Sequence, residues 1–425
     1  MQRRLIEMLI NLKKINPSKM AQYAKDKTDF YQKFYQNYNV NNFKALPLLT
    51  KNDLTGLDPF ELLSRDFVDE VSYYGETSGS SGSPTPCFFT ARDFKNLTGL
   101  CALTPYTPLI SQTLQENRVT VNGLTFGYTI AGFSFTQILL QCHAMVAQLG
   151  SRSTIATPER NARTIAKLKP SIIAATPLDL MVWLEIIRTD LPDEYPEVLR
   201  NLKILFSTAE PCANTRKQQL EKHFGIVHIN TYATVDGFIT IPCPCGEKHI
   251  IDGLYEIELY DQNLKSLGSY GTGRLCFTNL LRKTSPLVKY LIDDYVTITP
   301  STCPHGFKNS VAPKGRYELT VDLNNRTWGS LDFEELVYKF GLPIDYRIYI
   351  HDEQIQVELE EYPSCPGYDI SSLKTELTTL TGLTVEVKLL KLGDLTSIRK
   401  VRENKSIIKI LDLRKTSRQV LPQIL

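Results

Sequence analysis

The sequence predicts an α/β protein with a large N-terminal domain, residues 1–314, and a small α+β C-terminal domain, residues 315–425. Short β-rich runs alternate with amphipathic segments from about residue 70 to 230, which is typical of a layer built on a largely parallel sheet. β-rich segments dominate between 250 and 300, so the large domain is expected to hold mixed β-sheets as well as helices. A second alternation of strands and helices begins near Gly315, and its length suits a separate small domain.

The first 70 residues are expected to be helical and polar. Aromatic side chains recur there at helical spacing and predict a packed face; they are Tyr23, Phe30, Tyr31, Phe34 and Tyr35. The apolar segment 130–149 is interrupted by polar side chains, so we expect a buried helix rather than a membrane span. Further on, buried strands are predicted at 153–156, 171–175 and 202–206, with helices at 160–168, 177–188 and 214–224.

The β-rich part and the small domain complete the expected order of elements. Alternating apolar and polar residues predict strands at 255–260 and 295–298. The small domain is predicted to contain a strand at 317–321, a helix at 333–340, strands at 345–351 and 354–360, a helix at 370–380 and a strand at 384–390.

The composition is that of an ordinary soluble globular protein. With 42% hydrophobic residues, 22% charged residues and a net charge of +2, neither a nucleic acid nor a membrane is expected as a partner. Nine cysteines, an odd number scattered along the chain, indicate reduced thiols. The N-terminal residues lack the apolar core and cleavage site of a signal peptide, so a cytoplasmic protein is expected, either monomer or homodimer.

A loop rich in glycine and hydroxyl groups occupies residues 77–86, which read Thr-Ser-Gly-Ser-Ser-Gly-Ser-Pro-Thr-Pro. Glycines let the backbone approach a ligand closely, while peptide N–H groups and hydroxyls can donate to phosphate oxygens. The runs on either side are β-like, so the segment reads as a turn between two strands. An ordinary hairpin turn without a ligand is the alternative.

Further motifs follow this loop in a fixed order. They are Ala209-Glu210-Pro211, Tyr232-Ala233-Thr234-Val235-Asp236, Thr278-Asn279-Leu280, the run from Pro286 to Asp294, and Gly315-Arg316. Together with the loop they resemble the adenylate-forming superfamily, and within it the phenylacetate-CoA ligase branch. The resemblance covers nearly the whole chain after residue 70. It implies a large adenylation domain and a small C-terminal domain that is mobile about a hinge near Gly315.

The resemblance also implies an activity. The chain would activate a carboxylic acid, aryl or otherwise hydrophobic, with ATP and Mg²⁺, release pyrophosphate, and pass the acyl group to a thiol, with coenzyme A as the first choice. A carrier-protein thiol or an amine would use the same first half-reaction. Carboxylate attack on the α-phosphate needs a site that positions two anions and stabilises spreading negative charge.

Site residues are carried over by position. The phosphates would be held by the loop residues Thr77, Ser78, Gly79, Ser80, Ser81 and Gly82, and the adenine would lie against Ala209, Glu210 and Pro211. Tyr232 would stack near the base, and Asp294 would accept the ribose hydroxyls. Asp236 would help to hold Mg²⁺, and Arg316 would join the nucleotide contacts at the hinge. The acid pocket would be lined by Phe126, Tyr128, Phe133 and Ser207, although these rings could equally be core. Likewise, Asp294 could be a carboxylate in a solvated turn.

A basic C-terminal run resembles the family segment whose lysine moves over the active site during adenylation. Lys405 is the predicted catalytic lysine, and Lys400 and Lys409 are alternatives. A lysine there would neutralise charge on the acid and the α-phosphate. Without the resemblance, such a run would read as a solvated face.

Two short Cys/His pairs, Cys243-Pro-Cys245 with His249 and Cys303-Pro-His305, have the composition of a structural Zn²⁺ site. The resemblance implies the ligands Cys243, His249, Cys303 and His305, with Cys245 as the rival of Cys243. Unrelated buried cysteines are the alternative.

The chain departs from the family pattern at several positions. Ser83 stands where lysine is usual, Val235 replaces a hydroxyl that would contact the α-phosphate, and Asp236 is shorter than the usual glutamate. Loss of such a hydroxyl contact costs on the order of 1.5 to 3 kcal/mol. A second hypothesis is therefore a weakly active or inactive relative that binds nucleotide or serves as a scaffold.

Overall fold

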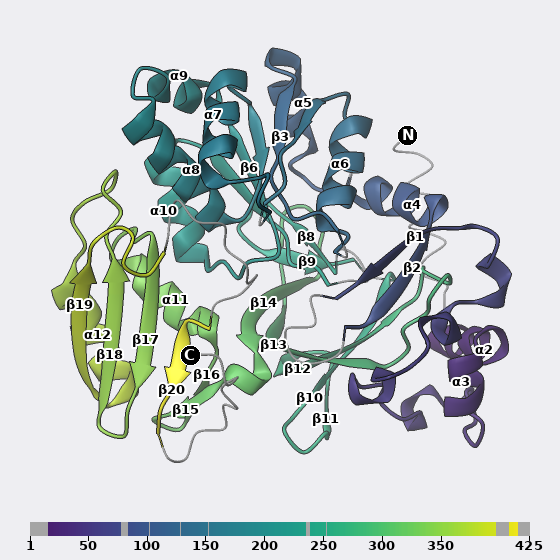
Figure 1. Ribbon diagram of the computed structural model, residues 1–425. Coiled ribbons are helices and arrows are strands. Elements are labelled where there is room, and N and C mark those ends of the chain that lie inside the picture. The colour runs from purple at the N-terminus through teal and green to yellow at the C-terminus, as the bar shows by residue number, and fades with distance from the viewer. Residues whose placement is uncertain are drawn as a thin grey trace. The chain divides into compact units, whose positions relative to one another are not determined.

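The computed structural model describes residues 16–77, 84–101, 103–127, 129–151, 153–234, 239–251, 253–396 and 408–414. Figure 1 labels the helices and strands of the chain. The chain divides into two compact units. The first unit takes residues 1–108, 126–141 and 231–312, and the second takes 109–125, 142–230 and 313–425. Each unit holds both helices and strands, so the predicted α/β class with mixed sheets is confirmed.

The first unit opens with helices α2 (Pro17–Lys27) and α3 (Asp29–Phe34). The side chains of Asn16 and Thr28 cap their N-termini by accepting backbone N–H groups of the first turn. The predicted aromatic face is confirmed, because Phe30 and Phe34 stack at 5.2 Å and Tyr31 and Tyr35 lie 5.2 Å apart in a buried cluster.

Strands make up most of the remaining first unit. β1 (Val71–Glu76) and β2 (Pro86–Thr90) pair antiparallel, and helix α4 (Ala91–Cys101) follows and contacts α6 (Ala131–Gln141). A five-stranded sheet has the order β11-β10-β12-β13-β14, with β10 at Tyr255–Tyr260, β11 at Ser266–Gly268, β12 at Gly271–Asn279, β13 at Tyr290–Pro300 and β14 at Asn309–Arg316. Before β10 in the sequence, β8 (Thr240–Pro242) and β9 (Lys248–Ile250) form an antiparallel hairpin.

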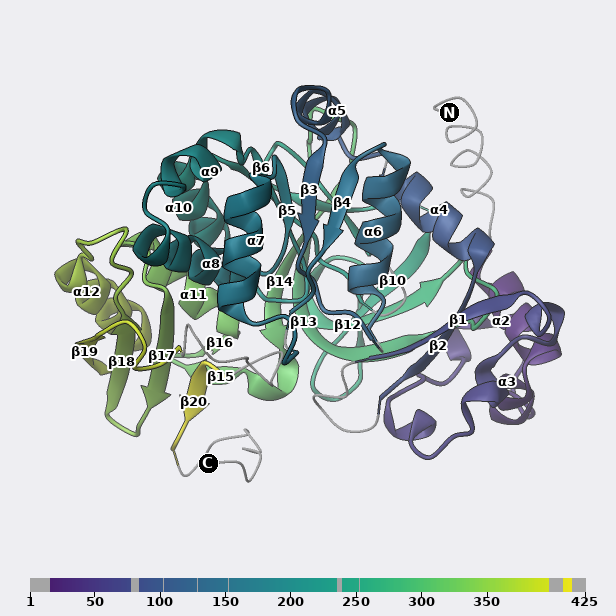
Figure 2. The same cartoon turned by 45° about the horizontal axis from the view of Figure 1, so that its top comes forward.

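A parallel five-stranded sheet forms the centre of the second unit. Its order is β4-β3-β5-β6-β7, with β3 at Val119–Asn122, β4 at Met145–Gln148, β5 at Ile172–Ala174, β6 at Ile204–Ser207 and β7 at Val227–Asn230. The helices that connect or precede these strands are α5 (Thr107–Glu116), α7 (Pro158–Leu168), α8 (Pro177–Asp190), α9 (Tyr195–Asn201) and α10 (Asn214–Phe224). In Figure 2, α7 lies in front of the strands. The predicted largely parallel sheet is confirmed.

Two predictions in this region are wrong. Residues 153–156 form no strand, and Ile155 is 70% exposed, so an apolar run here does not mark a core element. The helix expected over 130–149 ends with α6 at Gln141. His143 has a φ of 59°, which breaks the helix, and the chain then enters β4.

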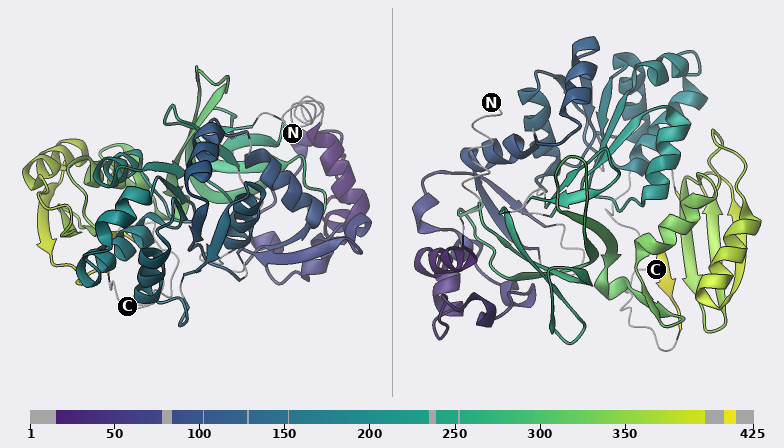
Figure 3. Two further views of the ribbon diagram at one scale, coloured as in Figure 1. Left: turned by 90° about the horizontal axis from the view of Figure 1, so that it is seen from above. Right: turned by 180° about the vertical axis from the view of Figure 1, so that it is seen from behind.

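The C-terminal part of the second unit carries a four-stranded sheet of order β19-β18-β17-β20. Its elements are β15 (Val321–Leu323), β16 (Arg326–Trp328), α11 (Ser330–Lys339), β17 (Asp345–Ile350), β18 (Gln354–Glu360), α12 (Ile370–Thr381), β19 (Thr384–Leu390) and β20 (Ile410–Asp412). Helices α11 and α12 contact each other and lie on one side of this sheet (Figure 3, right). The expected α+β organisation is confirmed.

The strand expected at 317–321 needs a correction. Residues Tyr317–Leu319 form a 3₁₀ turn, and Thr320 closes it by donating its N–H and hydroxyl to the carbonyl of Tyr317. The neighbouring strand β15 begins only at Val321.

One hydrophobic core runs through the described part of the second unit. It includes Trp183 on α8, Leu205 on β6, Phe333 on α11 and Ile348 on β17, all buried. The parallel sheet and the C-terminal sheet therefore share a core within the second unit. The domain boundary at 314 and 315 stays a prediction. Among the described residues no helix is long and apolar enough to cross a membrane.

Candidate functional site

The base of the hydroxyl-rich loop is a closed hairpin. Thr77 donates its N–H to the carbonyl of Thr85 at 3.1 Å, and Thr85 donates its own N–H to Oγ1 of Thr77 at 2.8 Å. β1 and β2 pair antiparallel on either side, so the two strands predicted to flank the loop are confirmed. The phosphate-binding residues predicted at 78–82 lie outside the described residues, so their role stays a prediction.

Two predicted nucleotide contacts meet in the first unit. The Tyr232 hydroxyl donates to Oδ2 of Asp294 at 2.6 Å. Asp294 lies on β13, and the backbone at Tyr232 is fixed because its carbonyl accepts the hydroxyl of Thr240 at 3.0 Å. The residues predicted at the base and at the ribose are therefore neighbours, as one nucleoside would require. Asp236 lies outside the described residues.

The Ala209-Glu210-Pro211 motif follows β6, at the carboxyl edge of the parallel sheet where ligands of open α/β sheets bind. Ala209 adopts a φ of 68°, which is rare for a residue with a side chain. Oε1 of Glu210 accepts from the fully buried Arg216 at 2.7 Å, and Oε2 accepts the N–H of Leu178 at 3.2 Å. The Glu210 side chain is thus held by the protein, and the predicted adenine contact of the motif stays a prediction.

Ser207 belongs to a buried polar chain at the same edge. Its Oγ lies 2.6 Å from Nε2 of His228 and accepts from the Asn230 amide at 2.7 Å. All three residues are buried on adjacent strands β6 and β7. His228 and Asn230 were not singled out from the sequence, and the signal for them is their place at the end of a strand that precedes Tyr232.

The other predicted acid-pocket residues are in the first unit. Phe133 on α6 stacks on Tyr73 at 5.1 Å and meets Phe94 edge-on at 4.8 Å, so it is part of an aromatic cluster. Phe126 is 40% exposed. Tyr128 lies outside the described residues, and Ser207 belongs to the other unit. A pocket formed by these four side chains stays a prediction.

The predicted hinge is tightly packed. Gly315 has a φ of +113°, and a Cβ there would lie 2.3 Å from Oγ of Ser330, so any other residue would be strained and would require the Ser330 side chain to move. Arg316 is partly buried at the end of β14. Its predicted contact with nucleotide stays a prediction.

Among the three candidate catalytic lysines, Lys409 alone falls within the described residues. Its Nζ lies 2.9 Å from Oδ1 of Asp345 and 4.0 Å from Oε1 of Glu210. Lys409 is therefore part of an ion-pair network in this conformation. Lys405 and Lys400 lie outside the described residues.

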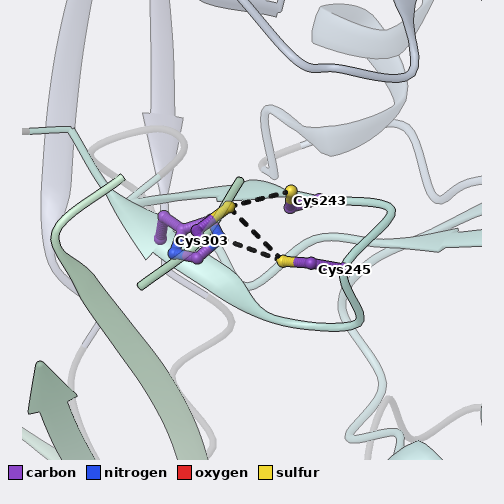
Figure 4. A group of neighbouring side chains, drawn as sticks. Cys243, Cys245 and Cys303 are labelled. Atoms are coloured by element: carbon purple, nitrogen blue, oxygen red, sulfur yellow. Dashed lines mark hydrogen bonds between the residues drawn. The ribbon is translucent and has the colours of Figure 1, made fainter. Parts of the chain in front are cut away.

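A cysteine and histidine cluster lies in the first unit (Figure 4). One donor atom from each of Cys243, Cys245, His249 and Cys303 falls within a group whose members all lie within 4.8 Å of one another. Sγ of Cys303 is 3.6 Å from the sulfurs of both Cys243 and Cys245, and Cys245 is 3.5 Å from Nε2 of His249.

The backbone presents these donors in two matching turns. Gly246 donates its N–H to the carbonyl of Cys243 at 3.0 Å, and Gly306 donates to Cys303 at 2.9 Å. Both glycines have a positive φ, near 90° and 85°. Each turn thus directs the side chains of a Cys-Pro-Cys or Cys-Pro-His run to one point.

The spacing fits a tetrahedral zinc ion. Bonds of about 2.3 Å to sulfur and about 2.0–2.1 Å to nitrogen place two sulfurs about 3.8 Å apart and a sulfur and a nitrogen about 3.5 Å apart. The observed distances are close to these values. His249 also has the support typical of a metal ligand, because its Nδ1 is hydrogen-bonded to the carbonyl of Asn309 and its ring stacks on Phe307.

The group of mutually close donors differs by one residue from the ligand set implied by the resemblance, and that set stays a prediction. Nδ1 of His305 lies 3.1 Å from Cys243 and 3.7 Å from Cys303, but the group of mutually close donors contains Cys245 in its place. Burial raises the pKa of Cys243 to about 12. Desolvation also raises the pKa of Cys303, but hydrogen bonds from the backbone and ring of His305 and from the other two thiols outweigh it and lower that pKa to about 6. In the metal-free protein, the thiol of Cys303 is thus more readily deprotonated than that of Cys243.

Comparison with known proteins agrees with the sequence motifs. No protein-family model matches the chain. Phenylacetate-coenzyme A ligase of Escherichia coli (strain K12) is 20% identical over 399 residues, which is 88% of this chain and 86% of that protein. Phenylacetate-coenzyme A ligase of Thermus thermophilus is 24% identical over 321 residues, 71% of this chain and 68% of that protein.

Solved structures show the same fold. 2-Hydroxyisobutyryl-CoA ligase in the postadenylation state, in complex with R3-HIB-AMP, matches with a TM-score of 0.73 at 16% identity, covering 95% of this chain and 89% of that one. The GH3.15 acyl acid amido synthetase matches with a TM-score of 0.60 at 13% identity, covering 93% and 91%. The chain therefore has the fold of adenylate-forming ligases, and its resemblance to the phenylacetate-CoA ligase branch is confirmed over most of its length.

Proposed function

We propose that this protein is an AMP-forming ligase that activates a carboxylic acid and transfers the acyl group to coenzyme A. The observation that carries the proposal is the Tyr232–Asp294 pair, since two residues 62 positions apart, each predicted to contact a different part of one nucleoside, share a hydrogen bond. Similarity to phenylacetate-coenzyme A ligase over 88% of the chain supports the same reaction class.

The proposed first step is an in-line displacement. An oxygen of the acid attacks the α-phosphorus of ATP, the bond to the bridging oxygen of the β-phosphate breaks, and pyrophosphate leaves with its charge offset by Mg²⁺. The loop closed by Thr77 and Thr85 would hold the β- and γ-phosphates, and Asp294 would accept the ribose hydroxyls. In the second step a thiol adds to the acyl carbonyl and AMP departs.

We also propose that a structural Zn²⁺ binds Cys243, Cys245, Cys303 and His249. Four protein ligands leave no open coordination position, so the ion would link the turn after β8 to the segment that precedes β14 rather than take part in catalysis. His305, which contacts two of these cysteines, is the alternative to Cys245.

The test of the activity is acid-dependent exchange of labelled pyrophosphate into ATP, with Lys405→Ala as the control. Exchange that depends on one aryl or hydrophobic acid is the expected result. If no acid from a broad panel supports exchange above the control, the ligase proposal fails, and nucleotide binding by calorimetry then tests the degenerate, scaffold-type relative.

The acceptor needs a second assay on an active preparation. Coenzyme A, a carrier protein bearing a phosphopantetheine thiol, and simple amines are added separately, and AMP release together with the acyl product is measured. Thioester formation on coenzyme A is expected. The match to an acyl acid amido synthetase is the specific reason to include amines.

A further inference from the structure

The C-terminal sheet ends in an edge strand that pairs on one side. β19 pairs in parallel with β18 along all seven of its residues, and no second strand pairs with it within the part of the chain that the structure describes. Figure 1 shows β19 at the margin of this sheet, on the side opposite β20. An edge strand presents a row of backbone N–H and C=O groups that can pair with a strand of another chain.

β19 lacks the features that usually prevent such pairing. Residues 384–390 contain no proline, and the pairing with β18 runs without a register shift, so no bulge bends the strand away. Leu389 is an apolar residue of this strand and is 41% exposed. The charged residues Glu386 and Lys388 direct their side chains to a face of the sheet and not along its plane, so they leave the edge accessible to another strand.

The hydrogen bonds to β18 show which backbone groups point outward. Thr384 donates its N–H to the carbonyl of Glu353 at 3.3 Å, and at the other end of the strand Leu390 accepts the N–H of Glu361 at 3.0 Å. Bonding to one neighbour alternates along a strand, so the even-numbered residues of β19 bond to β18. The outward-pointing backbone groups belong to the odd-numbered residues Val385, Val387 and Leu389.

This alternation restricts how a second copy of β19 can pair with the first. Two identical strands related by a twofold axis run antiparallel, and residues with outward-pointing groups must lie opposite each other. Near the middle of the strand, the axis can therefore pass through Glu386, Val387 or Lys388. An axis at Glu386 would place two glutamates directly opposite each other, and an axis at Lys388 would do the same with two lysines, which is unfavourable.

The axis at Val387 is the register that the side chains favour. It places Glu386 opposite Lys388 of the second copy, and Lys388 opposite the second Glu386, so two pairs of opposite charge form across the edge. Of the three registers, this one alone pairs all seven residues of the strand.

The other face of β19 is apolar in the same register. Val385 and Val387 are partly buried and pack against the core that includes Leu373 and Leu377 of α12. The exposed Leu389 would lie opposite Val385 of the second copy, so the pairing would continue this apolar face across the edge. Charge and apolar pattern thus both fit a second copy of the same strand.

We propose that β19 forms a homodimer interface, in which two four-stranded C-terminal sheets join antiparallel about a twofold axis at Val387. The interface is one strand wide and is at the small end of specific interfaces, so we expect a reversible dimer with a Kd of about 1–100 µM. The proposal does not depend on the function proposed above.

Sedimentation equilibrium over about 1–200 µM protein tests the dimer by charge reversal. Glu386→Lys places a lysine opposite Lys388, and Lys388→Glu places a glutamate opposite Glu386. Each variant alone should raise the Kd at least about tenfold. An equimolar mixture of the two, or the double variant Glu386→Lys/Lys388→Glu, should dimerise with a Kd within about threefold of wild type, since opposite charges again face each other.

The control is Glu353→Lys, which makes the same change of charge at an exposed residue outside β19 and should keep the wild-type Kd. Gln354 donates to Glu386 within the same chain at 3.2 Å, so thermal unfolding is used to verify that each variant is folded. A wild-type protein that stays monomeric throughout this range overturns the proposal. So does a dimer that neither single charge reversal weakens, because its interface would then lie elsewhere.

Hydrogen exchange resolved to single amides locates the interface independently. In samples that sediment as dimers, the amides of Val385, Val387 and Leu389 should exchange several times more slowly than in dilute monomer. The amides of the even-numbered residues, which bond to β18 in both states, should keep their rates. If the odd-numbered amides are already protected in the monomer, another segment of the same chain covers the edge, and the dimer proposal is wrong.

Discussion

Single side chains in the first unit allow a direct test of the proposed nucleoside contact. Asp294 is bound by Tyr232, and its neighbour Asp293 is directed differently, with Arg274 at 3.8 Å. We predict that Asp294→Asn raises the KM for ATP about tenfold, because a hydrogen bond to a charged acceptor contributes about 1.5–3 kcal/mol. Asp293→Asn is the matched control and should leave the KM unchanged. Equal KM values for both variants would contradict the assignment of Asp294 to the ribose.

Asp345 predicts how stability changes with pH. Burial alone raises the pKa of Asp345, but Lys409, Arg347 and the hydroxyl of Thr396 outweigh it and hold the pKa below the ordinary value of 3.8. The folded protein therefore keeps this group ionised where the unfolded chain protonates it, so its stabilisation is present above about pH 4 and is lost on acidification.

Asp345→Asn should consequently be less stable than wild type by about 3–5 kcal/mol at pH 7, since the buried Arg347 and the partly buried Lys409 lose their charged partner. The difference should shrink as the pH falls below 4. Urea unfolding of both proteins from pH 3 to 8 measures it. A difference that is constant across this range would mean that the carboxylate does not act through its charge.

The site illustrates what residue patterns can and cannot specify. Tyr232 and Asp294 were found from motifs because each sits at a fixed place in an ordered series. The partners of Ser207 were missed, since His228 and Asn230 reach it only through the register of β6 and β7. For the same reason the sequence could not decide between Cys243 and Cys245, because the place of each thiol among the other donors depends on how two turns approach each other.

The turns at Cys243–Gly246 and Cys303–Gly306 lead to a prediction about zinc content and about the loss of zinc. Purified without chelator, the protein should contain one zinc per chain, and Cys243→Ser, Cys245→Ser and Cys303→Ser should each lose it. His305→Ala should retain zinc, and Cys142→Ser, at an exposed thiol outside the cluster, is the control. Stripping zinc should lower the unfolding midpoint by at least about 5 °C.

Metal analysis and thermal scans of the five variants give the answer. If Cys245→Ser retains zinc and His305→Ala loses it, His305 rather than Cys245 is the fourth ligand. If wild type contains no zinc, the proposed zinc site is wrong.

Gly315, near the end of β14, leads to a prediction about stability. We expect Gly315→Ala to lower the free energy of unfolding by about 1–3 kcal/mol, because the backbone has a positive φ and the new Cβ would clash with Ser330. Gly382→Ala, also at a positive φ but with no atom within 4 Å of the added Cβ, should cost less. Denaturant unfolding compares them, and equal costs would show that the close approach to Ser330 relaxes freely.

Elements were predictable where a local signal marks their ends. α7 and α8 both begin with a Thr-Pro pair whose threonine caps the helix, and α10 ends at a glycine with φ 66°. The strand expected at 153–156 failed because an apolar run does not reveal whether a partner strand is available. β3 and β4, by contrast, were missed since their short sequences gain strand character only from pairing with each other and with β5.

At the scale of the whole molecule, the shared core of the second unit bears on the predicted mobility of the small domain. Polar contacts reinforce that core: Glu335 on α11 accepts the N–H groups of Asn214 and Thr215 at the start of α10, and Arg216 pairs with Glu210 near Glu334. A rotation of residues 315–425 about Gly315 would have to break these contacts. These contacts therefore stabilise the present orientation of residues 315–425 against the parallel sheet. A substrate can shift the protein to a rotated orientation only by binding that orientation more tightly.

This leads to a prediction about cooperativity. Arg216→Met should lower the free energy of opening of β6 and of β17 by similar amounts, about 3 kcal/mol, because it removes the cation nearest to the partly buried Glu210 and to the buried Glu334. Amides of β12 in the first unit should keep their protection if the two units open separately. Native-state hydrogen exchange followed by peptide mass spectrometry measures all three strands in one sample, with Lys217→Met on the adjacent, partly exposed position as the control. A loss of protection confined to β6 would show that the C-terminal sheet opens on its own, and the small domain would then be free to rotate without disturbing the parallel sheet.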